Sequence, residues 1–186
     1  MIYKKLILIV SLLALFSTEC RTVRPRDMIP GLERGRVIYS EGARKPTEAE
    51  LTAVDLLLKQ LLSMVQRKDW SDLPGLVSKK KGIYVDLKGF RSFAQLEADV
   101  RDRGSYLYVF YHDTDTLRAF THDKDQIAVR EVLMSGKSIR VDYYMEEGSQ
   151  ECELALHATG NEKEDYRLNH PVFIREDGVW KVYRLF

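Results

Sequence analysis

The chain has 186 residues, of which 45% are hydrophobic and 10% aromatic. These proportions are typical of folded proteins and exclude disorder over most of the chain. The 29 basic and 28 acidic residues nearly cancel, so the chain has no global positive field to attract nucleic acid, and we expect no nucleic-acid partner.

The first twenty residues have the layout of a secretory signal. Lys4 and Lys5 precede an apolar run over residues 6–16, and the segment ends at Cys20. The run is too short for a transmembrane helix, which needs about 20 apolar residues. We therefore interpret residues 1–19 as a cleaved signal peptide.

The position of Cys20 makes this segment similar to bacterial lipoprotein signal peptides, in which small residues precede an invariant cysteine. The resemblance implies that Cys20 is lipidated, with palmitate, and becomes the mature N-terminus. Glu19 replaces the usual Gly, Ala or Ser, so the motif looks more like the looser spirochaete type. We expect a lipoprotein of the cell envelope whose lipid binds the membrane, with the membrane and the side left open. Because of Glu19, ordinary cleavage and secretion stays an alternative.

Residues 20–45 are rich in arginine, proline and glycine. This composition favours a basic linker between the lipid and a folded domain, and it would lie near anionic lipid headgroups. The apolar residues 37–39 leave a second interpretation open, a short strand at the edge of the domain.

A single α+β domain is predicted over residues 46–186. Thr47 and Glu50 form a capping box, and apolar residues then recur at helical spacing. This pattern predicts a helix over residues 48–67, with Leu58 and Leu61 buried against the sheet.

The middle of the domain is predicted as a series of short elements. Residues 83–85 have the pattern of a strand, residues 90–102 that of a helix, and the aromatic residues 106–111 that of a second strand. A polar stretch follows over residues 112–126. The next apolar residues, 127–133, fit a short helix or a strand about equally.

From Ser138 the apolar period changes to two, which predicts strands. A second strand includes Cys152 on its inward face, a third covers residues 166–175, and a turn at Asp177-Gly178 leads to a last strand over residues 179–186. A free buried thiol is favoured for Cys152, although a Cys20–Cys152 disulfide, which would exclude lipidation, stays open.

These elements predict an α+β fold in which an N-terminal helix packs on a curved antiparallel sheet that ends in a meander. The element order and the ending Asp177-Gly178-Val179-Trp180 resemble the cone-shaped fold of ketosteroid isomerase and the nuclear transport factor family. The resemblance covers residues 46–186 and transfers no catalytic residue. A cystatin-like domain is the rival.

A repeated His-Asp-x-Asp pattern is the best candidate for chemistry. It could supply imidazole and carboxylate ligands to a divalent metal, while the alternative is a polar loop in which Asp side chains cap turns. The six candidate ligands are His112, Asp113, Asp115, His122, Asp123 and Asp125.

Tyrosine side chains are the candidates for lining a ligand-binding cone, although aromatic residues are also common in strands and cores. They are Tyr106, Tyr108, Tyr111, Tyr143, Tyr144, Tyr166 and Tyr183.

No catalytic set stands out in the sequence, and we expect no cofactor. The leading hypothesis is a non-catalytic binding or interaction module, with either a small apolar ligand or an envelope or host protein as its partner. The alternative is a metal-dependent envelope enzyme that uses residues 112–125.

Overall fold

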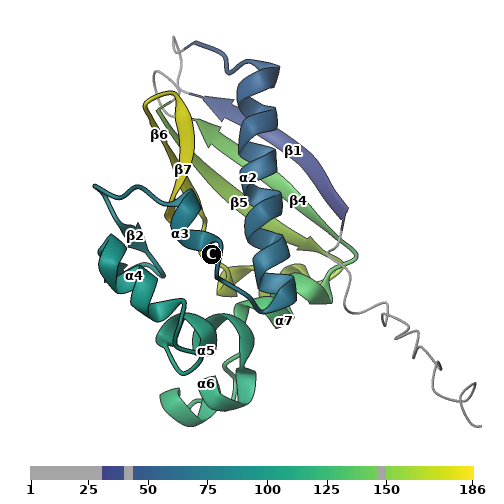
Figure 1. Cartoon of the computed structure of the whole chain (residues 1–186). Coiled ribbons are helices and arrows are strands. Elements are labelled where there is room, and N and C mark those ends of the chain that lie inside the picture. Colours follow the sequence, from purple (N-terminus) through teal and green to yellow (C-terminus); the bar gives the residue numbers. More distant parts are fainter. Residues whose placement is uncertain (1–30, 40–43, 146–149) are drawn as a thin grey trace, which may run out of the picture.

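A computed structural model describes residues 31–39, 44–145 and 150–186. Cys20 lies outside these residues, as does Gly148, at which the sequence predicts a turn between the first two strands after Ser138. Seven strands form one open mixed sheet in the order β1-β4-β5-β6-β7-β2-β3, and helix α2 crosses one face of it (Figure 1). The α+β class and the curved sheet are therefore confirmed.

The strands are β1 (Gly31–Tyr39), β2 (Ile83–Tyr84), β3 (Phe90–Arg91), β4 (Ser138–Met145), β5 (Glu151–Thr159), β6 (Val172–Glu176) and β7 (Val179–Arg184). Strands β4 to β7 form the predicted antiparallel meander. The sheet is not antiparallel throughout, because β1 pairs with β4 and β2 with β7 in parallel.

Helix α2 (Glu48–Arg67) has the predicted bounds, and its capping box is present. The Thr47 hydroxyl accepts from the backbone N–H of Glu50, and the Glu50 carboxylate accepts from the backbone N–H of Thr47. Leu58 and Leu61 have no exposed surface, as predicted. This apolar face of the helix forms the main core with the inward side chains of β4 and β5.

The linker interpretation of residues 20–45 is wrong for residues 31–39, which form the edge strand β1. Two arginines fix this strand. Arg36 donates from its backbone and its guanidinium to the buried carboxylate of Asp142, at 2.7 to 2.9 Å. Arg34 forms ion pairs with Glu48 and Asp55 of α2. The interpretation of residues 37–39 as an edge strand is therefore the correct one.

A second correction concerns residues 106–111, which form helix α5 (Tyr106–His112) and not a strand. Their aromatic composition favours strands, but Leu107, Tyr108 and Tyr111 are buried at helical spacing. The burial of this one face in the folded protein favours a helix over a strand for these residues.

The remaining short elements differ from the predictions in their bounds. Helix α4 (Phe93–Asp99) is shorter than predicted, because Phe90 and Arg91 pair with β2. The predicted polar stretch contains helix α6 (Thr114–Thr121), and the segment that fitted helix or strand is helix α7 (Val129–Ser135). The other helical turns are α3 (Leu73–Leu76) and η3 (Glu162–Arg167).

The end of the chain follows the predicted hairpin with one change. Asp177 and Gly178 both have positive φ, at 50° and 81°, which is the geometry of a tight hairpin turn. Residues 166–171 do not belong to the third strand, which begins at Val172 after η3.

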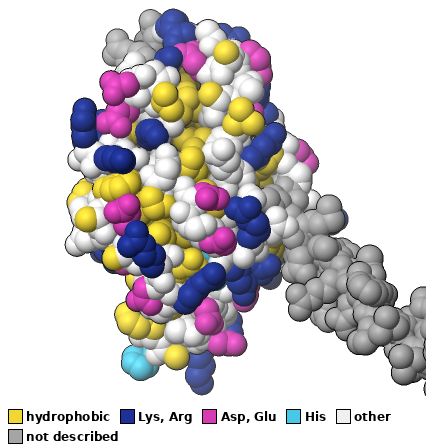
Figure 2. All heavy atoms as spheres, in the orientation of Figure 1, with side chains coloured by type: hydrophobic (Ala, Val, Ile, Leu, Met, Phe, Trp, Pro, Cys, Tyr) yellow, Lys and Arg dark blue, Asp and Glu magenta, His cyan; other side chains and the backbone are white. Residues whose placement is uncertain are grey.

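On the face seen in Figure 2, basic and acidic side chains are interspersed, and neither sign of charge forms a large patch. This distribution agrees with the near-zero net charge of the sequence.

Candidate functional site

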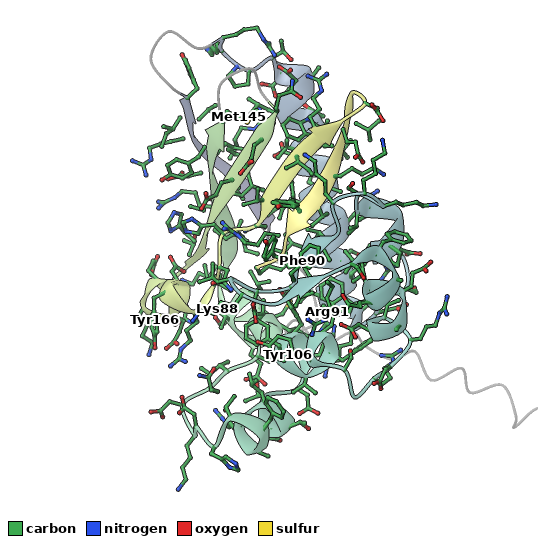
Figure 3. The ribbon with its side chains drawn as sticks, turned by 90° about the vertical axis from the view of Figure 1, so that its left-hand side faces the viewer. Lys88, Phe90, Arg91, Tyr106, Met145 and Tyr166 are labelled. Atoms are coloured by element: carbon green, nitrogen blue, oxygen red, sulfur yellow. The ribbon has the colours of Figure 1, made fainter. Side chains whose placement is uncertain are left out.

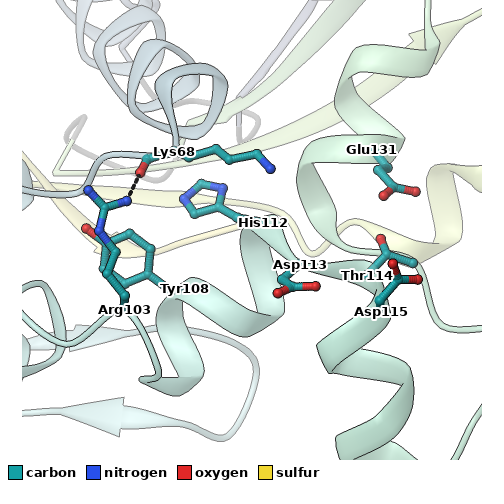
Figure 4. Close-up of a pocket in the computed structure, with 8 residues that line it drawn as sticks. All are labelled: Lys68, Arg103, Tyr108, His112, Asp113, Thr114, Asp115 and Glu131. Atoms are coloured by element: carbon teal, nitrogen blue, oxygen red, sulfur yellow. Dashed lines mark hydrogen bonds between the residues drawn. The ribbon is translucent and has the colours of Figure 1, made fainter.

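A cavity of about 390 Å³ lies at the C-terminal end of α2, between this helix and α5, α6 and α7 (Figure 4). Its size is at the lower end of the range for small-molecule sites, which is about 300–1,000 Å³. It is lined by Lys68, Arg103, Tyr108, His112, Asp113, Thr114, Asp115 and Glu131.

His112 is the last residue of α5. Among the side chains that line the cavity, it alone is buried and has polar atoms without a hydrogen-bond partner among the described residues. It exposes 7% of its surface, and neither ring nitrogen has a hydrogen-bond partner. Its ring stacks on Trp70, with centroids 5.4 Å apart and planes 28° apart. The indole nitrogen of Trp70 is also buried without a partner.

Within the part of the chain that is described, these two stacked rings hold every buried side-chain nitrogen or oxygen without a partner. Such atoms are rare in folded proteins because leaving one unsatisfied costs about 1–3 kcal/mol. Three of them lie in two adjacent rings beside the cavity, each with less than 1 Å² of exposed surface, so a group in the cavity can reach them only when the side chains that cover them move.

The environment keeps His112 neutral at physiological pH. Burial, and then the positive charges of Lys68, Arg130 and Arg103, lower the pKa of His112 to about 4. A neutral imidazole has one N–H donor and one acceptor nitrogen. The ring can therefore give one hydrogen bond and take another, but it carries no charge with which to attract an ion.

The basic wall of the cavity is held by its own contacts. The Arg103 guanidinium donates to the backbone carbonyl of Lys68 at 2.7 Å and lies 4.7 Å from the centroid of the Tyr108 ring. The Tyr108 hydroxyl donates to the carbonyl of Val100. Lys68 is the C-cap of α2 and has the left-handed backbone conformation, with φ 55°. The end of the helix therefore holds the backbone of Lys68 in place beside the cavity.

The six predicted metal ligands divide into two groups at opposite ends of α6. Asp113 is the N-cap of α6 and accepts from the backbone N–H and hydroxyl of Thr116. His122 is the C-cap, and Asp123 accepts from Asp125 and Gln126 in the following turn. The sequence repeat is thus explained by helix and turn capping.

The structure brings three of the six together at the cavity: His112, Asp113 and Asp115. Across residues 31–39, 44–145 and 150–186, no group of three or more His, Cys, Asp or Glu side chains is arranged to hold a metal ion. The predicted metal site is therefore not formed there.

The predicted tyrosines do not line one common cavity. Tyr111 is fully buried and donates to the carbonyls of Val85 and Phe186. Tyr106 donates to Asp86, whereas Tyr166 lies apart from Tyr106 with 75% of its surface exposed (Figure 3).

The other tyrosines also make separate contacts. Tyr143 donates to Asp55 beneath α2, Tyr144 is exposed on β4, and Tyr183 packs edge-on against Tyr84. Only Tyr108 of the seven lines the His112 cavity.

Cys152 is buried and free, as its strand phase predicted. Burial, and then the nearby carboxylates, raise the pKa of its thiol to about 12. The thiol is therefore protonated and has the character of a core side chain, not of a nucleophile.

Sequence reasoning missed Lys68, Trp70, Arg103 and Glu131 as members or supports of the site. They come from three separate segments of the chain, at residues 68–70, Arg103 and Glu131, so no single local motif links them. The one usable signal was Trp70, a large aromatic residue in an otherwise polar stretch after α2.

No protein-family model matches this chain, and no curated protein matches it.

Proposed function

We propose that this protein is a lipid-anchored, non-catalytic binding protein of the cell envelope, and that the His112 cavity is its ligand site. The observation that supports the ligand site is the buried pair of Trp70 and His112, whose rings hold three nitrogens without a hydrogen-bond partner. The basis for the anchor is Cys20 at the end of the signal-like segment.

The lining favours a polar ligand over the apolar one expected from the tyrosines. Five of the eight lining residues carry formal charges, and a purely apolar ligand would leave the ring nitrogens of His112 unsatisfied. The buried nitrogens of His112 cost free energy as long as they have no hydrogen-bond partner. A ligand that hydrogen-bonds to them removes this cost, and its binding is favoured for that reason.

The anchor and the strand β1 together set the reach of the domain. If Cys20 carries lipid, residues 21–30 connect the lipid to β1, and ten residues extend to at most roughly 35 Å. The domain would then stay close to the membrane surface. No described helix is long and apolar enough to cross a membrane.

Metabolic labelling with a fatty-acid analogue tests the anchor. The wild-type chain should incorporate label and partition into detergent, whereas Cys20→Ala should do neither. Equal labelling of the two proteins would refute lipidation at Cys20.

Ligand-observed nuclear magnetic resonance with mixtures of small carboxylates, amines, amino acids, phosphates and sugars tests the cavity. We expect at least one class to bind the full chain and to lose binding in His112→Phe, which keeps the stacked ring but removes both nitrogens. His122→Asn is the matched control, because this histidine lies at the far end of α6. If no compound distinguishes His112→Phe from the control, the cavity is not the ligand site.

A further inference from the structure

The charged groups around the His112 cavity are separated by sign. In Figure 4, Arg103 lies at one end of the row of lining side chains, Asp115 and Glu131 lie at the other, and Lys68 and His112 lie between them. We propose that the ligand is a small zwitterion, with the chemistry of an α-amino acid or a dipeptide. This inference rests on the proposed function, because it assigns a ligand class to the same cavity.

The basic end has donors available for an anionic group. Lys68 makes no side-chain hydrogen bond or ion pair within the described residues, and its ammonium group has three donors. Arg103 uses one of its five N–H groups on the Lys68 carbonyl. The stacking of Arg103 on Tyr108 fixes its guanidinium plane, so a carboxylate can be bound there without much loss of side-chain entropy.

The acidic end has acceptors available for an ammonium group. Asp113 is occupied, since both of its oxygens accept from Thr116. The carboxylates of Asp115 and Glu131, by contrast, form no hydrogen bond or ion pair with any described side chain. Both residues are exposed and line the cavity.

His112 lies between the two ends and fits both halves of such a ligand. Each of its ring nitrogens exposes less than 1 Å² of surface, so the side chains that cover them must move before the neutral ring can donate from one nitrogen to a carboxylate and accept at the other from an ammonium group. A ligand that lacks either a hydrogen-bond acceptor or a hydrogen-bond donor would leave one of these nitrogens without a partner. The unsatisfied imidazole thus adds to the preference for a zwitterion that the surrounding charges create.

The size of the cavity is compatible with a small ligand. A volume of about 390 Å³ is at the lower end of the range for small-molecule sites. Amino acids and dipeptides combine this size with two opposite charges a few bonds apart.

Isothermal titration calorimetry on the full chain in detergent tests the proposal. The probes are the twenty common amino acids and glycine-containing dipeptides, each beside its N-acetyl and carboxamide derivatives. The best zwitterion should bind about tenfold or more tightly than either of its singly charged derivatives, because each derivative loses a hydrogen bond to a charged group.

Charge-removing variants locate the two halves of the ligand. Lys68→Asn, which suits the left-handed backbone, should weaken the zwitterion and leave the affinity of its carboxamide derivative, which has no carboxylate, unchanged. Glu131→Gln should weaken the zwitterion and leave the affinity of its N-acetyl derivative unchanged. Lys59→Gln and Glu97→Gln, which lie outside the cavity, are the matched controls and should bind as wild type does.

The outcomes separate this proposal from the one on which it rests. If singly charged compounds bind the cavity as tightly as zwitterions, in a manner that depends on His112, the site stands but the zwitterion assignment is refuted. If no compound of any class binds in a manner that depends on His112, both proposals fail.

Discussion

At the scale of single residues, the burial of His112 is the most informative feature of this protein. Its pKa of about 4 is lower than the ordinary value of 6.5, mainly because burial disfavours the charged ring. Unfolding exposes the ring and restores the ordinary pKa. Between these two values the unfolded chain binds more protons than the folded chain, so stability falls as the pH is lowered through this window.

The variant His112→Phe should remove this part of the pH dependence. Between pH 7 and pH 4.5 the wild type should lose about 2 kcal/mol more of its free energy of unfolding than the variant. Urea unfolding of both proteins at both pH values measures the difference, with His122→Asn expected to follow the wild type. Equal losses in wild type and His112→Phe would show that this imidazole is not held neutral by the fold.

At the scale of elements, helix α2 and strand β1 are attached to the sheet by different forces. Helix α2 buries an apolar face that its own periodicity predicts. Strand β1 is mostly exposed, and it is held by backbone pairing with β4 and by Arg34 and Arg36. Hydrophobic burial therefore fixes the helix, whereas backbone pairing and the polar contacts of two partly exposed arginines fix the strand.

For α2, Leu58→Ala and Leu61→Ala should each lower the free energy of unfolding by about 2–5 kcal/mol, since each leaves a cavity in the core. Leu56→Ala on the same helix, where 57% of the side chain is exposed, should cost less than about 0.5 kcal/mol. Chemical denaturation measures all three. A small effect at both buried positions would remove α2 from the core.

For β1, the close approach of Gly35 to the sheet gives a sharp test. A Cβ at this position would collide with the Asp142 carboxylate and lie 3.0 Å from the Val141 carbonyl oxygen. Gly35→Ala should therefore loosen β1 and speed hydrogen exchange of its amides, while those of β6 and β7 stay protected. Gly31→Ala in the same strand has open space around it and serves as the control. Unchanged exchange in Gly35→Ala would contradict the described packing of β1.

At the scale of the whole molecule, one core spans the sheet, α2 and the short helices. Cys152 lies in it without exposed surface, next to the C-terminal strands. Because burial raises the pKa of its thiol to about 12, the thiol is both inaccessible and protonated in the folded state. Its reactivity therefore reports opening of the core.

In a Cys20→Ala chain, Cys152 is the single thiol. Iodoacetamide should modify it very slowly in buffer, and the rate should rise with urea in parallel with global unfolding followed by circular dichroism. Rapid labelling under native conditions would place Cys152 in a part of the structure that opens locally.

The sequence by itself determined those elements whose signals are local. The capping box and periodicity of residues 48–67, the alternation of the β4–β5 strands, the turn at Asp177-Gly178 and the burial of Cys152 all follow from short-range patterns. These patterns are informative because they specify both a period and an apolar face.

Only the tertiary structure decided the states of residues 31–39 and 106–111 and the composition of the candidate site. Residues 31–39 are polar enough to suggest a linker, and they become a strand because Asp142, more than a hundred residues away, accepts from Arg36. Residues 106–111 have strand-forming composition, but packing buries one helical face. The His112 cavity likewise joins side chains from distant segments, and no sequence spacing encodes contacts that depend on how separate elements pack together.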